Sequence, residues 1–449
     1  MEVDDSSDNA GDGLNGDETR RQIENNDPSL TKLKIGRTTS TYFPNDVYFP
    51  NDGNRESIGA AIGRNTQLKE LIVHKFHGQE VEDLVRGLAA NRSIKRLRFS
   101  ECNLYDGAIF IILMPFFTDN HNLECLSINE CKFWQECIDT LASALEKFNT
   151  LKEFNLRNPY ESVTLTTSLI EAIAGHSSLT ELSLCGAAFG KNGCVLVAAM
   201  LQKEGPKLAL LDLMDTGMND KQAITLANGM RGNNSLKELE LGDNCITRTG
   251  WLEVFAALGN PSCALEKIGV CNNRINDFVL RMFLVIVLQN NNTLKSLDLS
   301  GNIKITSAGW EQLFRYLQSP NCGLEEIDLN SNRFNDELII SLSNVLVNYN
   351  ALKKLNLYNN HRVTEAGWQA LSAVLQDPNS ALERLNLDFN VINDDALISF
   401  ANSLVSNDKL KEFFLRRPSL PTSGKPSHES YVTQQVSCTR TTPTTLLRG

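Results

Sequence analysis

Few of the residues that could carry out chemistry stand at the spacings that chemistry requires. The six histidines are scattered, and none lies near a cysteine at the spacing of a zinc site. Cys125, Cys131 and Cys137 are six residues apart, unlike the ligands of a C-x-x-C site. The sequence contains no G-x-S-x-G nucleophile motif and no G-x-x-x-x-G-K-[ST] phosphate loop. We therefore expect no catalytic site, no metal site and no cofactor.

A regular period runs through most of the chain. The pattern L-x-x-L-x-L-x-x-N/C, with Ile, Val or Phe in place of some leucines, recurs from Leu68 to Leu410. The 342 residues between these two make twelve steps of about 28.5 residues each. The copies begin at Leu68, Ile94, Leu123, Leu151, Leu179, Leu208, Leu236, Leu265, Leu294, Leu324, Leu352, Leu382 and Leu410. A degenerate fourteenth copy is carried by Leu30, Leu33 and Ile35.

Each repeat predicts one short strand and one helix. Leucines two residues apart place their side chains on the same face of a strand. The second half of a repeat has helical spacing, as from Ala396 to Leu404, where Asn393 precedes the helix as a potential cap. Such a unit cannot bury its apolar face alone, so neighbouring units must stack. The predicted fold is an α/β solenoid of about 13–14 units, with a parallel sheet on the concave side and helices on the convex side.

A second period, twice as long, overlies the first. The dipeptide Gly-Trp begins at Gly250, Gly309 and Gly367, and a threonine stands three residues before each glycine. Long and short repeats therefore alternate. We interpret the three tryptophans as residues of the core, because they recur at the same place in every second unit.

The two ends of the chain differ in composition from the repeats. Residues 1–29 hold nine acids against Arg20 and Arg21, which is −7 of the total formal charge of −11. Half of residues 418–449 are Ser, Thr or Pro. We expect both ends to be disordered tails that flank a repeat domain over residues 30–417.

Composition excludes several classes of partner. An acidic chain without a block of Lys or Arg is a poor match for nucleic acid, which needs clustered cations. The longest apolar stretches fall short of the roughly 20 residues that span a bilayer, and no secretory signal is visible. Eleven cysteines without paired spacings suit a reducing compartment. We expect a soluble, cytoplasmic protein that binds neither nucleic acid nor membrane.

Two stretches resemble the ribonuclease-inhibitor-like family of leucine-rich repeats. They are L-K-S-L-D-L-S-G-N, from Leu294 to Asn302, and L-E-R-L-N-L-D-F-N, from Leu382 to Asn390. The resemblance covers residues 68–417 and implies a scaffold that binds a protein partner on its concave face. It leaves two alternatives open, a regulator resembling the Ran GTPase-activating proteins and a sensor module resembling the repeat region of nucleotide-binding immune receptors. The missing phosphate loop and the Ser/Thr-rich carboxyl end depart from those two groups.

The third, fifth, seventh and eighth positions of each motif should point out of the concave sheet. In the five central repeats these positions hold eight acids and a single base, Lys267. The acids are Asp212, Asp215, Glu238, Glu240, Asp243, Asp298, Glu326 and Asp328. Later repeats place Tyr358, Arg384 and Phe389 there. Together these eleven residues are the predicted partner-binding site, and the partner is expected to present a basic surface. The competing interpretation is that Asp at the fifth position is common in this repeat without any role in binding.

Overall fold

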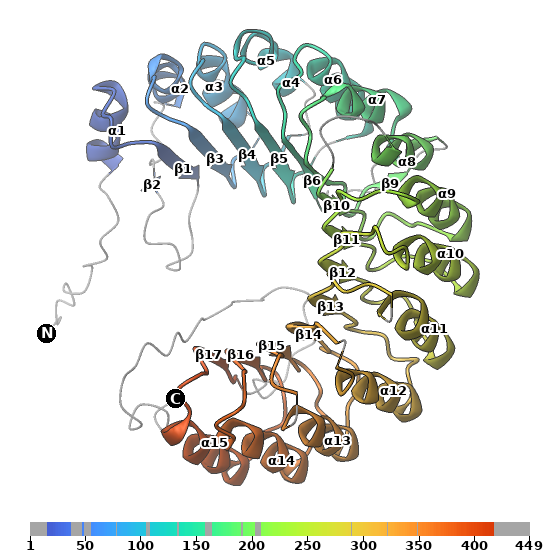
Figure 1. The fold of residues 1–449 in the computed structure, drawn as a ribbon. Coiled ribbons are helices and arrows are strands. Elements are labelled where there is room, and N and C mark those ends of the chain that lie inside the picture. The colour runs from blue at the N-terminus through green and yellow to red at the C-terminus, as the bar shows by residue number, and fades with distance from the viewer. Residues whose placement is uncertain are drawn as a thin grey trace, which may run out of the picture. The chain divides into compact units, whose positions relative to one another are not determined.

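The computed structural model consists of two compact units, Met1–Thr216 and Gly217–Gly449. It describes residues 16–36, 47–48, 55–77, 79–104, 108–132, 134–157, 164–189, 192–202, 208–288, 290–320, 322–347 and 349–416. In each unit taken by itself, strands lie side by side on one face and helices cover the other (Figure 1).

The first unit contains a parallel sheet in the order β10-β8-β6-β5-β4-β3-β1-β2, with a separate pair, β7-β9. Its strands are β1 (Lys32–Gly36), β2 (Val47–Tyr48), β3 (Glu70–His74), β4 (Arg96–Ser100), β5 (Cys125–Asn129), β6 (Glu153–Arg157), β7 (Thr164–Leu165), β8 (Glu181–Ser183), β9 (Ala188–Phe189) and β10 (Leu210–Asp212). Its helices are α1 (Gly16–Glu24), α2 (Arg55–Arg64), α3 (Gln79–Leu88), α4 (Ala108–Ile112), α5 (Met114–Asp119), α6 (Gln135–Leu145), α7 (Thr167–Gly175) and α8 (Gly193–Gln202).

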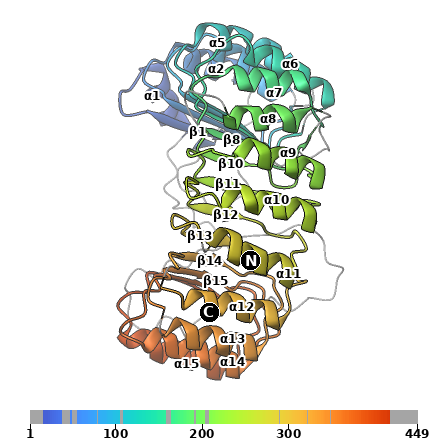
Figure 2. The same ribbon diagram turned by 45° about the vertical axis from the view of Figure 1, so that its right-hand side comes forward.

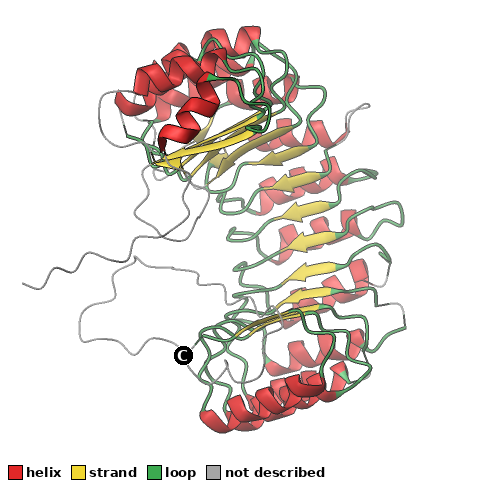
Figure 3. Ribbon diagram, turned by 90° about the vertical axis from the view of Figure 1, so that its left-hand side faces the viewer, coloured by secondary structure: helices red, strands yellow, loops and turns green. Residues whose placement is uncertain are grey.

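The second unit repeats the same plan more regularly, with parallel strands that follow one another in chain order (Figure 2). The strands are β11 (Glu238–Glu240), β12 (Lys267–Gly269), β13 (Ser296–Asp298), β14 (Glu326–Asp328), β15 (Lys354–Asn356), β16 (Arg384–Asn386) and β17 (Glu412–Phe414). The helices are α9 (Asp220–Met230), α10 (Arg248–Leu258), α11 (Asp277–Phe283) with the π-helical turn η1 (Leu284–Leu288), α12 (Ser307–Leu317), α13 (Asp336–Leu346), α14 (Glu365–Gln376) and α15 (Asp394–Ser406). Figure 3 shows the alternation of strand and helix from the side.

The predicted repeat is confirmed. Each of the fourteen motif copies supplies one strand, and the degenerate first copy forms β1, which pairs in register with β3. The motif leucines of the inner repeats are buried; Leu297 and Leu329, for example, are each 1% exposed. In the last copy, Leu410, Phe413 and Leu415 are only partly buried. In each unit taken by itself, these side chains form an apolar core between the sheet and the helices, as stacked repeats require.

Buried asparagines at the ninth motif position connect neighbouring repeats of the second unit. Oδ1 of Asn302 accepts hydrogen bonds from the backbone N–H groups of Asn273 (3.1 Å) and Ile275 (3.0 Å). Its Nδ2 donates to the carbonyl oxygens of Val270 (3.0 Å) and Leu299 (3.0 Å). A buried amide with both ends paired turns an otherwise costly group into a specific link between repeats. The same position holds Asn244, Asn273, Asn302, Asn332, Asn360 and Asn390.

The longer period has a structural cause at the helix starts. Helices α9, α11, α13 and α15 are capped by their own asparagine, as Asn276 caps α11 by accepting from Val279 N. Helices α10, α12 and α14 start at a threonine that is bonded instead to an aspartate of the preceding repeat. Thr247 N and Oγ1 both donate to Asp220, at 2.6 and 2.5 Å. The tryptophans of the Gly-Trp pairs are fully buried, which confirms their assignment to the core.

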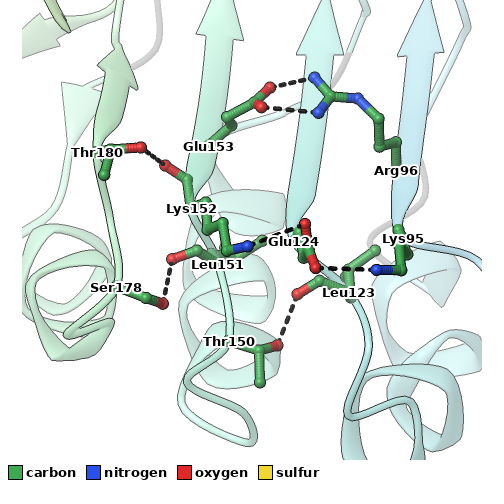
Figure 4. A network of polar contacts seen from close by, with 10 residues as sticks. All are labelled: Lys95, Arg96, Leu123, Glu124, Thr150, Leu151, Lys152, Glu153, Ser178 and Thr180. Atoms are coloured by element: carbon green, nitrogen blue, oxygen red, sulfur yellow. Dashed lines mark hydrogen bonds and ion pairs between the residues drawn. The ribbon is translucent and has the colours of Figure 1, made fainter. Parts of the chain in front are cut away.

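In the first unit, side chains at the start of the strands link one repeat to the next (Figure 4). Ser178 Oγ donates to the carbonyl oxygen of Leu151 at 2.9 Å. Glu124 lies between Lys95 (3.3 Å) and Lys152 (3.2 Å), so charges alternate across three strands. These ion pairs are partly exposed and stabilise the fold little, whereas backbone hydrogen bonds such as Lys152 N to the carbonyl oxygen of Glu124 pair the strands in register.

The amino-terminal end differs from expectation. A disordered acidic tail was expected over residues 1–29, yet α1 begins at Gly16 and Ile23 is buried. Asn65 Nδ2 donates to the carbonyl oxygen of Ile23, and Asn26 Nδ2 donates to Thr66 Oγ1. Helix α1 thus packs against α2, the next helix along the chain, and caps this end of the first unit. The Ser/Thr/Pro-rich segment 418–449 lies outside the described residues.

Candidate functional site

Strand alternation in the second unit puts the predicted acids on the open face of the sheet. In β11, Leu239 is buried while Glu238 and Glu240 on either side are partly exposed. In β14, Ile327 is likewise buried between Glu326 and Asp328. Parallel pairing in register then repeats each position across the sheet, so that Asp298 faces Asp328. The structure therefore brings these acids together as rows.

Asp212, in the first unit, does not belong to an open acidic face. Its side chain is only 5% exposed. It accepts a hydrogen bond from Ser183 Oγ (2.8 Å) and pairs with Arg157 (3.0 Å). Side chains of the two preceding repeats therefore cover the carboxylate of Asp212, which contributes no exposed acid to the predicted site.

The backbone conformation at Asp215 and Asp243 favours aspartate there. Both stand at the eighth motif position with positive φ, 52° and 53°. This left-handed conformation is costly for most residues, but Asp, Asn and Gly adopt it with the least strain. The same conformation recurs at Lys75, Glu101, Glu130, Gly186, Asn272, Gly301, Ser331, Asn359 and Phe389. Backbone geometry accounts for an acid at this position without any role in binding.

Lysines partly neutralise the acidic rows of the second unit. Lys267 Nζ lies 2.9 Å from Glu240 and 4.0 Å from Glu238. Burial disfavours the charged form of Lys267, but these carboxylates outweigh it and raise the pKa of the lysine. Lys354 pairs with Glu326 at 3.0 Å. Lys267 and Lys354 form ion pairs with three of the glutamates on this face. The face is therefore less negative than the number of its acids indicates.

The central pair of this face, Asp298 and Asp328, is half-buried. Burial raises the pKa of Asp298. Burial and, after it, the neighbouring charge of Asp298 raise the pKa of Asp328 to about 6. Asp328 still accepts hydrogen bonds from Asn330 N (2.9 Å) and Asn356 Nδ2 (2.8 Å). A cation brought beside this pair would favour both ionised forms, so the pair suits a positively charged ligand group.

The three later residues of the predicted site, Tyr358, Arg384 and Phe389, do not form one cluster. The rings of Tyr358 and Phe389 lie 5.0 Å apart, and Phe389 is 38% exposed. Arg384 contacts other residues, with its guanidinium 5.4 Å from the ring of Phe414 and an ion pair to Glu412. Phe389 also has a φ of 60°, which is a strained conformation for an aromatic residue. The repeat imposes this conformation at the eighth position, so what distinguishes Phe389 is a large aromatic side chain that is partly exposed beside Tyr358, a feature that binding surfaces use.

Sequence reasoning missed Arg157, the partner of Asp212. Counting the same outward positions in the repeat that starts at Leu151 would have placed Arg157 at the seventh, next to the acids of later repeats. Among the described residues, no group of three or more His, Cys, Asp or Glu side chains is arranged to hold a metal ion. No helix within the described ranges has the length and apolar character needed to cross a membrane.

Comparisons with known proteins agree with the repeat. Residues 232–251, 290–313 and 379–401 match the family described as Leucine Rich repeat. Ribonuclease inhibitor of Sus scrofa is 25% identical over 75% of this chain and 80% of its own length. The NACHT, LRR and PYD domains-containing protein 12 of Mus musculus is 27% identical over 72% of this chain, which spans only 31% of that relative.

A solved structure shares the fold. The crystal structure of the Rad7 and Elc1 complex in yeast matches with a TM-score of 0.51 and 16% identity, over 79% of this chain and 81% of the matched chain. At that identity the match shows the fold alone. One strand for each motif copy, the repeat matches and the likeness to ribonuclease inhibitor show a chain built of leucine-rich repeats that is similar to the ribonuclease-inhibitor-like family.

Proposed function

We propose that this protein is a non-catalytic scaffold that binds a protein partner on the open sheet face of its second unit. The observation that carries the proposal is the row of partly exposed acids on β11 to β14, which continues into the Tyr358–Phe389 pair. Aromatic side chains are common anchors of protein interfaces, and rows of charge select a partner of complementary charge.

The charge of the face determines the kind of partner. Glu238 and Glu326 are the most exposed of the paired acids, at 43% and 41% of their side chains. A partner that presents lysines or arginines would compete with Lys267 and Lys354 for the carboxylates of this face. Its positive charge would also offset the electrostatic repulsion between Asp298 and Asp328. Ribonuclease inhibitor, whose name says that it inhibits an enzyme, shares this architecture along most of its length.

The proposal can be tested by replacing the aromatic pair Tyr358 and Phe389. In the double variant Tyr358→Asn/Phe389→Asn, each residue becomes one that a neighbouring repeat carries at the same position, since Asn330 is at the seventh and Asn359 at the eighth. Asn tolerates the positive φ of Phe389, so relief of strain offsets part of the lost ring contact, and we expect stability to change by less than about 1 kcal/mol. Partner binding should weaken through faster dissociation.

The matched control is Ile340→Ala/Val347→Ala, which removes exposed apolar side chains near α13. Full-length wild type and both variants are used to capture proteins from an extract, and the captured protein is then purified and its dissociation rate measured. We expect a protein that wild type and control hold equally and that the Asn variant loses. If the Asn variant and wild type release the captured protein at the same rate while the control releases it faster, the binding face is on the helices and the proposal fails.

A further inference from the structure

Four cations stand at one repeated position in the loops that follow the strands of the second unit. They are Arg274, Lys304, Arg333 and Arg362, each two residues before the residue that caps the next helix. Their sequence spacings of 30, 29 and 29 residues match the repeat period. Because one repeat separates each from the next, stacking turns them into a single row.

The backbone of this row is fixed by the asparagine ladder. Asn273 and Ile275, on either side of Arg274, both donate to Oδ1 of Asn302. In the same way, the neighbours of Arg333 donate to Asn360 Oδ1, at 3.2 and 3.0 Å. Each arginine therefore sits at the tip of a small turn whose two flanking amides are bound to one oxygen. The backbone at these two arginines is therefore fixed before any ligand binds.

The four side chains are available. All four are exposed. None makes a side-chain hydrogen bond or ion pair with another residue of the described ranges, in contrast to Lys267 and Lys354 on the sheet face. Arg274 and Arg333 also have positive φ, 55° and 60°, where Gly217 stands at the same position two repeats before Arg274 with φ 67°. Glycine would satisfy that backbone at less cost, so the backbone conformation does not explain the arginines at these two positions.

We propose that the row of Arg274, Lys304, Arg333 and Arg362, hereafter the cation row, is a second docking surface that takes an acidic, extended segment of a partner protein. Strands of a sheet lie about 4.8 Å apart, so three steps place the outer cations about 14 Å apart. Carboxylates on alternate residues of an extended chain are about 6.8 Å apart, so three of them span the same length. The surface is distinct from the acidic sheet face and is opposite in sign.

An acidic peptide fits this row better than a nucleic acid does. The chain carries a net charge of −11, and the carboxylates Asp277 and Asp336 lie a few residues from the cations as helix-start ligands. Four cations in such surroundings would release few counterions from a phosphate backbone. A short acidic segment needs only these four contacts and carries no further charge past the row.

The test uses the full-length protein and a fluorescein-labelled decapeptide of alternating Ser and Glu, titrated at low salt and followed by fluorescence anisotropy. The variant Arg274→Glu/Arg333→Glu should bind this peptide at least about tenfold more weakly than wild type does. Glu fits the backbone there, because Glu101 and Glu130 hold the same left-handed conformation. The variant Arg274→Lys/Arg333→Lys keeps the charge and should retain most of the affinity.

Two controls separate the cation row from general charge effects and from the sheet face. Lys221→Glu/Arg315→Glu makes the same change in net charge at exposed residues of α9 and α12 and should leave peptide binding within about twofold. Tyr358→Asn/Phe389→Asn should leave it unchanged, so the two proposals can fail independently. Peptide affinity equal in wild type and the Glu variant, or no binding to wild type, would overturn the inference. So would tighter binding of a labelled oligothymidylate of equal charge, which would make the row a nucleic-acid site.

Discussion

The acids on the sheet face are of two kinds, those that the backbone conformation explains and those that it does not. Asp215 and Asp243 satisfy a left-handed backbone, whereas Glu238 and Glu326 have no such reason and are exposed. From the sequence alone, all of these acids were one class. The outward positions were predictable because strand alternation is local. The exposure of Asp212 was not, because its enclosing partner Arg157 lies 55 residues away in the chain.

His176 offers a residue-scale test of the buried core. Its ring is 4% exposed, its Nδ1 accepts from Leu151 N at 3.4 Å, and burial lowers its pKa to about 4. Since the folded pKa is below the unfolded value of about 6.5, this residue contributes stability that is present above pH 6.5 and is lost as pH falls toward 4. The loss amounts to about 3 kcal/mol at pH 4.

His176→Asn should remove most of that acid sensitivity. Asn65, Asn91 and Asn120 occupy the same position in three earlier repeats, where their Oδ1 atoms accept from backbone N–H groups. Urea denaturation at pH 4.5 and pH 7 should show a smaller difference in the free energy of unfolding for the variant than for wild type. An identical difference in both proteins would mean that His176 is not buried in the neutral form.

At the scale of elements, the two-repeat period comes from how helices begin. The sequence displayed the period through Gly250, Gly309 and Gly367 but not its cause, since the contact joins residues of adjacent repeats. A Cβ on Gly250 would lie 2.7 Å from Asp220 Oδ1, the same oxygen that accepts from Thr247 N. Although burial of Asp220 opposes its ionisation, the hydrogen bonds from Thr247 lower its pKa, so the charged form is the one that holds the helix start.

Gly250→Ala should therefore destabilise the protein by about 2 kcal/mol or more, because either the helix start or the Asp220–Thr247 contact must shift. Gly323→Ala is the matched control, since the nearest atom to its added Cβ would be 3.7 Å away. The control should change stability by less than about 0.5 kcal/mol. Thermal or chemical denaturation of the two variants beside wild type decides the point, and equal effects would contradict this account of the glycine.

At the scale of the whole chain, the number of repeats and the class of fold followed from counting the motif, because a solenoid is built from contacts between neighbouring repeats. The amino-terminal cap did not follow. Its helix is polar and acidic on one side and contributes only a few buried residues, such as Thr19 and Ile23, which is too weak a pattern to distinguish from a disordered tail. The cation row was missed because its members follow the motif at its tenth or eleventh residue, whereas only the outward positions within the strand motif were considered.

The cap predicts a difference between two truncations. A chain that begins at Gly16 keeps α1 and the contacts of this segment to Asn65 and Thr66, whereas one that begins at Leu30 loses the helix that packs against α2, including the buried Ile23. We expect the shorter protein to melt several degrees lower than the longer one, because apolar area is returned to water. Equal melting temperatures would show that α1 contributes nothing to the stack.

The most direct test of the central claim is the association rate of a captured partner with wild type, with Glu238→Lys/Glu326→Lys on the sheet face and with Glu311→Lys/Glu337→Lys on helices α12 and α13. Rates are measured at about 50 and 300 mM salt. These concentrations lie below and above the roughly 150 mM at which the screening length is about 8 Å. The account predicts association at least about tenfold slower for the sheet variant at low salt, a difference that shrinks at high salt, and little change for the helix variant. Rates that are equal for wild type and the sheet variant at both salt concentrations would contradict it.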